Sequence, residues 1–356
     1  MNSQSQKYSS LIESINQESG QAVRFMEVCG GHTWAIRKAG IPDLLPESIR
    51  LVSGPGCPVC VTSRGYINTA IALLDQPEVI LATFGDLMRV PGSIQSLEET
   101  IFHSRRIEVV LSPLDALQYA IRNPGKEVVF LGIGFETTAP GVAATIMQAR
   151  NEGIRNFSVL SSHKVMPPAM AALLDHRIPI DGFICPGHVS AITGQGIFEF
   201  IPREYHIPCV IAGFESEDIL ESILMLIRQI NSDNALVENQ YSRVVRANGN
   251  PKARAIMDEV FELSDDWWRG LGEIPGSGLS NRRKYSKWDA KEKFGVTISP
   301  EPEPPGCRCS DILKGLANPE DCALFGSDCT PDNPVGACMV SNEGTCQAWY
   351  RFNQSP

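Results

Sequence analysis

The sequence predicts an α/β fold in which two similar parallel-sheet α/β domains form a cleft and a smaller, mainly helical or irregular domain follows. First, short β-branched runs alternate with helical stretches from about residue 20 to 230, which is typical of βα units on a parallel sheet. Second, these runs form two sets of four, which indicates an internal duplication. Third, a proline-rich segment after residue 300 leads into six closely spaced cysteines.

Eight strands are expected in the alternating region. A helix is expected before them over residues 1–19, and two long helices at 217–230 and 252–263, where apolar residues recur at helical spacing. Residues 265–285 are rich in glycine and arginine and are expected to be irregular. The expected strands are RFMEVC, IRLVSG, VILATF and IEVVLS in the first half, and EVVFLGIGF, FSVLSS, GFICPG and IPCVIAG in the second.

These elements divide the chain into three predicted domains. Domain I covers residues 20–122 and contains Cys29 and the CPVC motif, and domain II covers 123–225. The third domain covers 226–356 together with the N-terminal helix 1–19. A chain of 356 residues is long enough for each domain to bury its own core.

Composition narrows the possible functions. Hydrophobic residues make up 43% of the chain and charged residues 20%, as in an ordinary globular protein. The first twenty residues lack the apolar run of a secretory signal, and no segment has the roughly 18 apolar residues of a membrane span, so we expect a cytoplasmic protein without membrane contact. The net charge of −10 disfavours nucleic acid as a partner. In a reducing compartment, many cysteines indicate metal binding or redox chemistry.

Most of the Cys, His and small-residue motifs follow the ends of predicted strands. In open α/β sheets, the loops beyond the carboxyl ends of the strands form the ligand crevice, and pockets often lie between domains. The sequence therefore predicts one site in a cleft between domains I and II. The glycines at these ends are expected to leave room there for a segment of a partner protein; they are Gly30, Gly31, Gly54, Gly56, Gly85 and Gly187.

Three thiols follow the first two strands. Cys57 and Cys60 form a C-x-x-C pair after a GPG turn, a placement near a helix N-terminus that can lower a thiol pKa. Cys29 precedes two glycines, which would let a ligand approach the backbone, and its thiol could bind soft iron. The alternative is that these thiols are unreactive. Cys185 and Cys209 lie within apolar strands and are expected to be packed thiols.

Polar residues also follow the strands and are candidates for ligand contact. His32 and Thr33 stand beside Cys29, and Glu136, His163 and His188 follow strands of the second half. Each has a structural alternative, because histidines are often hydrogen-bonded structural residues and a Glu-Thr-Thr run can cap a helix.

The C-terminal cysteines exceed what one four-thiolate metal site can use. Zinc and a [4Fe–4S] cluster both take four thiolates held on loops. Paired C-x-x-C knuckles, common in zinc sites, do not occur here, and surplus thiols beside a metal are more useful when the metal is redox-active. A [4Fe–4S] cluster is therefore favoured, and zinc or plain reduced cysteines remain alternatives. The six are Cys307, Cys309, Cys322, Cys329, Cys338 and Cys346.

Together these segments resemble the hydrogenase maturation factor HypD family over nearly the whole chain. The resemblance rests on CGGHT, GPGCPVC, FGDLMRVPG, GFETTAP, SSHKVMPP, CPGHVS and the terminal cysteine block. It implies a scaffold on which the Fe(CN)2CO unit of [NiFe]-hydrogenase is assembled. It also implies a stable complex with HypC, transient contact with HypE as the cyanide source, and indirect service to the hydrogenase large subunit.

The resemblance also implies roles for the cysteines. Cys29 would bind the iron of the transient Fe(CN)2CO unit, and Cys57 and Cys60 would be a redox-active dithiol beside it. Cys309 and Cys338 would be a second dithiol. The ligands of a [4Fe–4S] cluster would be Cys307, Cys322, Cys329 and Cys346.

Two other functions are compatible with the residues alone. An iron–sulfur thiol–disulfide oxidoreductase would use the same cysteines to reduce a disulfide of a protein partner. A zinc-stabilised binding module would have no redox role.

Overall fold

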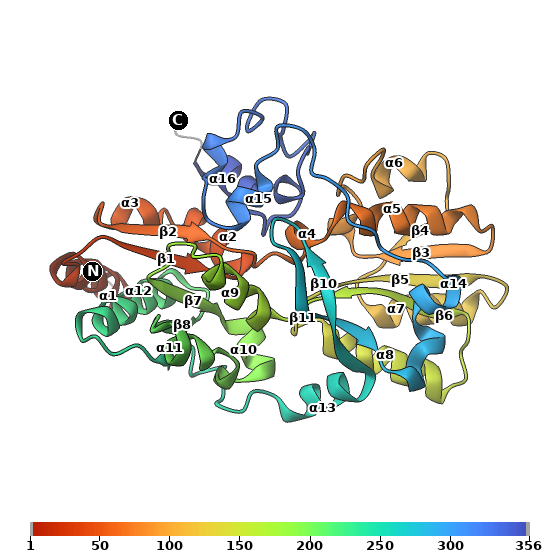
Figure 1. Cartoon of the computed structure of the whole chain (residues 1–356), viewed down its shortest axis with the longest axis horizontal. Helices are drawn as coiled ribbons and strands as arrows, with labels where there is room; N and C mark the ends of the chain where they lie inside the picture. Colours follow the sequence, from red (N-terminus) through yellow and green to blue (C-terminus); the bar gives the residue numbers. More distant parts are fainter. Residues whose placement is uncertain (1–2, 354–356) are drawn as a thin grey trace.

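The computed structural model describes residues 3–353 as an α/β protein with two parallel sheets side by side along its long axis (Figure 1). The strands are β1 (Val23–Glu27), β2 (Ile49–Ser53), β3 (Val79–Thr83), β4 (Ile107–Val109), β5 (Glu127–Gly134), β6 (Phe157–His163), β7 (Gly182–Pro186), β8 (Cys209–Ala212), β9 (Val237–Asn239), β10 (Phe261–Trp268) and β11 (Gly272–Asn281). Sheet A has the order β2-β1-β7-β8-β9, and sheet B has the order β4-β3-β5-β6. Their strands all run parallel.

All eight predicted strands are present, but the two sheets do not follow the predicted ranges 20–122 and 123–225. Strands β1 and β2 pair with β7 and β8, whereas β3 and β4 pair with β5 and β6. Each sheet therefore takes strands from both halves of the chain. The strands of both halves are apolar runs, as in any parallel sheet covered on two faces, so their pattern does not identify their partners.

The helices pack around the sheets. In sequence order they are α1 (Ser3–Glu18), α2 (Gly30–Lys38), α3 (Ile41–Leu44), α4 (Pro58–Val61), α5 (Arg64–Ala72), α6 (Leu97–Ile101), α7 (Pro113–Arg122), α8 (Ala139–Asn151), α9 (Met166–Asp175), α10 (Gly187–Thr193), α11 (Phe200–Tyr205), α12 (Ser216–Asn231), α13 (Pro251–Val260), α14 (Ala290–Phe294), α15 (Cys309–Leu313) and α16 (Thr345–Phe352). The 3-10 helices are η1 (Leu73–Asp75), η2 (Gly85–Leu87), η3 (Gln195–Phe198), η4 (Arg283–Trp288), η5 (Pro319–Asp321) and η6 (Ala337–Met339). The predicted N-terminal helix is α1, and residues 1, 2 and 354–356 of the predicted ranges lie outside the described residues.

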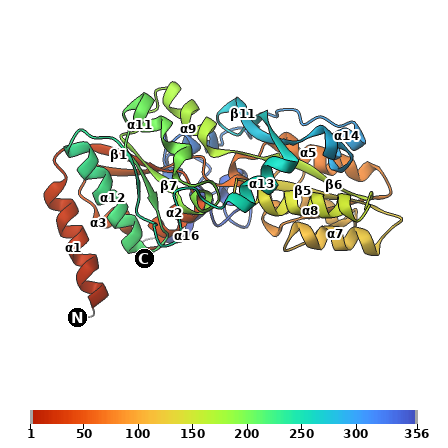
Figure 2. The same cartoon turned by 90° about the horizontal axis from the view of Figure 1, so that it is seen from below.

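Helix α12 crosses the predicted boundary between domain II and the third domain. It packs on β7 and β8 of sheet A, and α1 packs against it; Figure 2 shows these two helices side by side at one end of the molecule. The boundary predicted between residues 225 and 226 therefore falls inside a helix, and β9 beyond it belongs to sheet A. Within residues 3–353, no helix is both long and apolar enough to cross a membrane.

The segment expected to be irregular forms most of an antiparallel hairpin. Strands β10 and β11 pair along their length, and the helix predicted over 252–263 ends at Val260. The glycines of β11 serve the hairpin, because a Cβ atom on Gly278 would lie 2.6 Å from the Cβ atom of Asp266 on β10. Glycine in a strand often marks a place where another backbone segment approaches closely. Composition alone does not distinguish such a glycine-rich strand from a glycine-rich loop.

The cysteine block, residues 307–352, lies above the junction of the two sheets (Figure 1). Helix α16 packs on α2, and η6 packs on α4. One hydrophobic core joins the three parts, with Phe183 of sheet A, Leu131 of sheet B and Cys338 of the block among its members. The block is therefore held against both sheets.

Candidate functional site

Cys29 and the CPVC segment meet at the carboxyl edge of sheet A. Cys29 is the N-cap residue of α2, two residues beyond the end of β1. The amide of Gly30 donates a hydrogen bond of 3.0 Å to the carbonyl of Gly56. A Cβ atom on Gly56 would lie 2.2 Å from the amide nitrogen of Cys29, so a larger residue would displace backbone. Two motifs from separate strand ends therefore form one unit.

Cys57 and Cys60 form a disulfide, with their Cα atoms 5.2 Å apart. Cys57 is the N-cap residue of α4, and its sulfur accepts a hydrogen bond of 3.2 Å from the amide of Cys60. Pro58 follows at the first helical position, where a missing N–H is tolerated. A thiol at a helix N-terminus gains thiolate character, so the geometry suits a pair that can be oxidised or reduced.

Carboxylates surround Cys29. Glu27 is buried, and its two oxygens accept hydrogen bonds of 3.1 Å from the Cys29 amide and 2.5 Å from the Thr33 hydroxyl. Burial raises the pKa of Glu27 to about 8. Burial first, and then the charges of Glu343 and Glu27, raise the pKa of the Cys29 thiol to about 12. The unliganded thiol therefore stays protonated at neutral pH, and metal binding would release its proton.

His32 and His188 stack on opposite sides of Phe214. The ring centroid of Phe214 lies 4.6 Å from that of His32 and 4.0 Å from that of His188. His32 is buried, and its Nε2 donates to the Gly213 carbonyl at 3.0 Å. Burial lowers the pKa of His32 to about 4, so the ring is neutral, and its Nδ1 has no hydrogen-bond partner within residues 3–353. These rings therefore share the edge of sheet A with Cys29.

Glu136 and His163 lie at the carboxyl edge of the other sheet. Glu136 accepts a hydrogen bond of 2.9 Å from the Met166 amide, and His163 pairs with the Ser161 hydroxyl at 2.9 Å. Burial raises the pKa of Glu136 to about 7 and lowers that of His163 to about 3. In the described chain, one Glu136 oxygen and the His163 Nε2 lack hydrogen-bond partners. Both side chains therefore bond to residues in or just after strand β6 of sheet B.

The four cysteines that the family resemblance implies as cluster ligands line one pocket of the cysteine block. Its wall also includes Cys309 and apolar side chains such as Leu324 and Phe325. A Cβ atom on Gly336 would lie 2.5 Å from the Cys309 sulfur, so glycine leaves that space to sulfur. Thiolates in an apolar pocket are the donors that an iron–sulfur cluster uses, and in this respect the residues fit the group. Within the described chain, no group of three or more His, Cys, Asp or Glu residues is arranged to hold a metal ion.

Cys338 lies at the centre of a thiol network. The neighbouring thiols of Cys309 and Cys346 lower the pKa of Cys338 despite its complete burial, and the charge of Arg269 acts in the same direction. Cys338 belongs to η6, the turn that packs on the CPVC helix α4. The thiols of the block therefore come close to the disulfide.

A short segment of the cysteine block contacts both sheet edges. The hydroxyl of Ser341 donates to Asp86 after β3 at 3.1 Å. Two residues on, Glu343 abuts Gly30, where a Cβ atom would lie 2.4 Å from the Glu343 Cβ. Residues 341–343 therefore link the edges of sheets A and B.

The expectation that strand-end glycines leave room for a partner is wrong for most of them. Cβ atoms on Gly30, Gly54, Gly56 and Gly187 would collide with atoms of this chain, whereas Gly85 has only Val109, at 3.9 Å, within reach. These glycines permit close packing of the loops on one another. Cys185 and Cys209 are fully buried, as expected.

The sequence interpretation missed Glu27, Phe214, Glu343 and Arg269. Glu27 carries a usable signal, since a carboxylate within the apolar run RFMEVC is costly to bury without a purpose. The other three acquire their roles from contacts across elements, which no local pattern reports.

Comparisons with known proteins agree with the sequence resemblance. The family model HypD, described as the hydrogenase formation hypA family, matches residues 5–353. A hydrogenase expression/formation protein HupD from Azotobacter chroococcum is 48% identical over 93% of this chain and 89% of its own length. The hydrogenase maturation factor HypD2 of Bradyrhizobium diazoefficiens is 47% identical over 97% of this chain and 93% of its own.

An archaeal relative extends the comparison. A putative hydrogenase expression/formation protein of Methanocaldococcus jannaschii is 45% identical over 96% of each chain. The α/β fold, the thiol-rich sheet edge and these matches define the class as hydrogenase maturation proteins. Within that class, the chain belongs to the HypD family.

Proposed function

We propose that this chain is the scaffold on which the Fe(CN)2CO unit of [NiFe]-hydrogenase is assembled, and that Cys29 holds the iron. The contact of Gly30 and Gly56 supports this most, because it fixes a single thiol next to a redox-capable disulfide. Low-spin iron carrying cyanide and carbonyl is a soft centre that favours thiolate. The carboxylates beside Cys29 would then keep the empty site protonated until iron binds.

The Cys57–Cys60 pair is proposed to exchange electrons beside this iron. Reduction of the disulfide to two thiols takes two electrons and two protons. The packing of η6 on α4 supports the cysteine block as their source, since it brings the turn of Cys338 to the CPVC helix. Cys309 and Cys338, whose thiols interact, are proposed as the second dithiol.

A resident [4Fe–4S] cluster is proposed for the pocket in the cysteine block. Its ligands would be Cys307, Cys322, Cys329 and Cys346, which all line that pocket. The cluster, when bound, supplies single electrons, whereas the neighbouring dithiols of this chain hold electrons in pairs.

The proposed partners are HypC in a stable complex and HypE in a transient one, with the hydrogenase large subunit served indirectly. Family membership supports these partners. Residues 341–343 contact both sheet edges beside Cys29, and we propose that HypC reaches the iron held by Cys29 near this segment.

The alternative function is an iron–sulfur thiol–disulfide oxidoreductase acting on a protein partner, and the Cys57–Cys60 disulfide favours it. Infrared spectroscopy of the chain purified anaerobically together with HypC separates the two. We expect cyanide and carbonyl stretching bands. A complex fully loaded with iron but lacking these bands would contradict the scaffold function and leave the oxidoreductase.

A further inference from the structure

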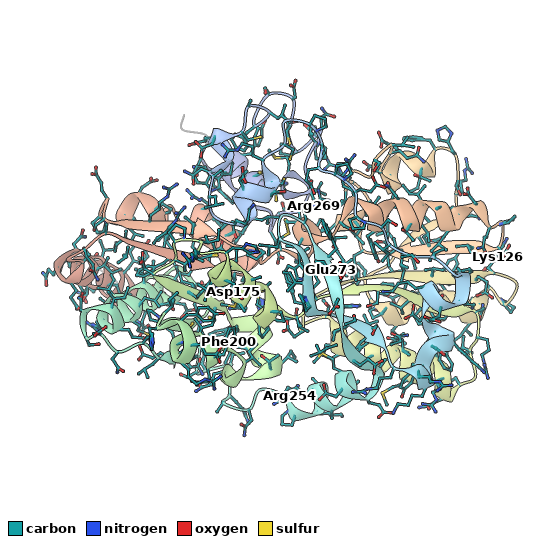
Figure 3. All side chains as sticks on the ribbon, in the orientation of Figure 1. Lys126, Asp175, Phe200, Arg254, Arg269 and Glu273 are labelled. Atoms are coloured by element: carbon teal, nitrogen blue, oxygen red, sulfur yellow. A yellow bond between two sulfur atoms is a disulfide. The ribbon has the colours of Figure 1, made fainter. Side chains whose placement is uncertain are left out.

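Arg269 is a fully buried cation at the turn of the β10–β11 hairpin, with 1% of its surface exposed. Figure 3 shows it at the end of the hairpin, below the cysteine block. Its backbone amide donates to the Val61 carbonyl at 2.9 Å. Its Nε and Nη2 donate to the Thr62 carbonyl at 3.1 and 2.9 Å, and its Nη1 pairs with Glu303 at 2.5 Å. Arg269 therefore directs both backbone and side-chain donors at one short segment.

That segment is the C-terminal end of the disulfide-bearing helix. Helix α4 is a single turn, with Cys57 at its N-cap and Cys60 in its last residues. Thr62, whose carbonyl binds the guanidinium, follows Cys60 by two residues, and one helical turn of about 5.4 Å separates the two ends of α4. The Arg269 amide binds the last helical carbonyl, that of Val61, and the guanidinium binds the carbonyl of the C-cap residue Thr62. A buried cation acts on a neighbouring charge more strongly than it would in water.

The hairpin has a second anchor besides Arg269. Lys164, also 1% exposed, donates to the Asp266 carboxylate and the Trp267 carbonyl, each at 2.8 Å. At the tip, a Cβ atom on Gly270 would lie 2.9 Å from the Cα atom of Ser310, beside Cys309. The tip of the hairpin is therefore wedged between the CPVC helix and the cysteine block.

We propose that Arg269 is a positioning residue for the Cys57–Cys60 pair: it fixes the end of α4, and its buried charge favours the reduced pair over the disulfide. This inference rests on the redox role proposed above. Reduction by two electrons breaks the S–S bond. With one proton the products are one thiol and one thiolate, and with two protons they are two thiols. A reduced C-x-x-C pair can carry a thiolate, and a nearby cation stabilises that anion. The neutral disulfide gains nothing from the charge.

The test is a redox titration of the full chain, purified anaerobically. The protein is equilibrated in mixtures of dithiothreitol and its cyclic disulfide, which supply and accept the two electrons. Free thiols are then alkylated, and the oxidation state of the Cys57–Cys60 peptide is measured by mass spectrometry. The variants are Arg269→Gln, Arg269→Lys and Glu303→Gln, with Lys164→Gln as the matched loss of an equally buried cation that contacts the same hairpin.

The expected shifts have opposite signs. Arg269→Gln should move the equilibrium about tenfold toward the disulfide, which is about 30 mV for a two-electron couple. Glu303→Gln leaves the Arg269 charge uncompensated and should move it toward the dithiol. Arg269→Lys should lie between wild type and Arg269→Gln, and Lys164→Gln should stay within about twofold of wild type.

Three results would overturn the inference. They are an unchanged equilibrium in Arg269→Gln, a shift of the same sign in Glu303→Gln, and an equal shift in Lys164→Gln. If Arg269→Gln does not fold, Arg269→Lys and Glu303→Gln decide by their signs. A wild-type pair that stays oxidised, or stays reduced, in every mixture would instead refute the proposed redox role itself.

Discussion

Gly56 packs so closely on Cys29 that a Cβ atom at position 56 would lie 2.2 Å from the Cys29 amide nitrogen. The Gly56 carbonyl also accepts the hydrogen bond of the next amide, that of Gly30. The loop that leads into the disulfide is therefore in direct backbone contact with the single thiol at the end of β1. A displacement of either loop must move the other.

Gly56→Ala should destabilise the fold by about 1–3 kcal/mol, the usual cost of forcing extra atoms into packed structure. Urea unfolding measures the change. Gly141→Ala is the matched control, because Gly141 lies in α8 with open space around it, and alanine there should add about 0.5–1 kcal/mol. A Gly56→Ala protein as stable as wild type would show that the two loops are not packed in this way.

Cys29→Ser should fold normally and keep its C-terminal metal, but lose the infrared bands of the cyanide and carbonyl ligands and fail to mature hydrogenase. The reason is that a serine hydroxyl is a hard donor and does not replace thiolate on soft iron. Cys209→Ala, which removes a buried thiol of the same sheet, should keep the bands. Bands at wild-type intensity in Cys29→Ser would move the anchor to Cys57 or Cys60.

Glu136→Gln should change how stability depends on pH. Burial raises the pKa of Glu136 to about 7 from 4.5, so between these values the folded state holds a proton that the unfolded state has released. Stability therefore falls as pH rises through this window, by about 3 kcal/mol at most. The glutamine variant lacks this loss.

Denaturant unfolding at pH 4.5 and pH 7.5 measures the difference between wild type and Glu136→Gln. Glu18→Gln is the control: a hydrogen bond from Arg228 lowers the pKa of Glu18, so this carboxyl titrates below the window. Parallel pH profiles for wild type and Glu136→Gln would show that the Glu136 carboxyl is already ionised in the folded protein at low pH.

Cys322→Ala and Cys346→Ala should each lose iron and sulfide and loosen the cysteine block, because bonds between thiolate and metal also contribute folding free energy. Wild type should be brown with about four irons and four sulfides per chain. Iron and sulfide analysis, with limited proteolysis of the block, measures both effects. Cys185→Ala should retain its metal. Stoichiometric zinc without sulfide in wild type would refute the cluster.

The positions of the strands could be predicted from the sequence because the signal is local. RFMEVC and EVVFLGIGF are short apolar runs that end in glycine or cysteine motifs, and both form strands where expected. The rule that parallel strands present their carboxyl ends at one edge also predicts that Cys29 and Cys57 lie near each other. The cysteine spacings and motif resemblance identified the family.

Sheet membership was decided only by the tertiary structure. Phe25 of β1 pairs with Gly182 of β7, and no local pattern specifies a partner so distant in sequence. The same holds for the hairpin, where glycines that resemble a loop allow two strands to approach.

The surroundings of the thiols likewise come from nonlocal packing. Burial and, after it, the charge of Glu343, more than three hundred residues away, raise the pKa of Cys29, and Arg269 reaches the CPVC helix from the turn of a hairpin. Periodicity reports which residues are apolar and how they repeat along one element. Burial and charge at a site depend on which elements pack together, and that was decided by the fold as a whole.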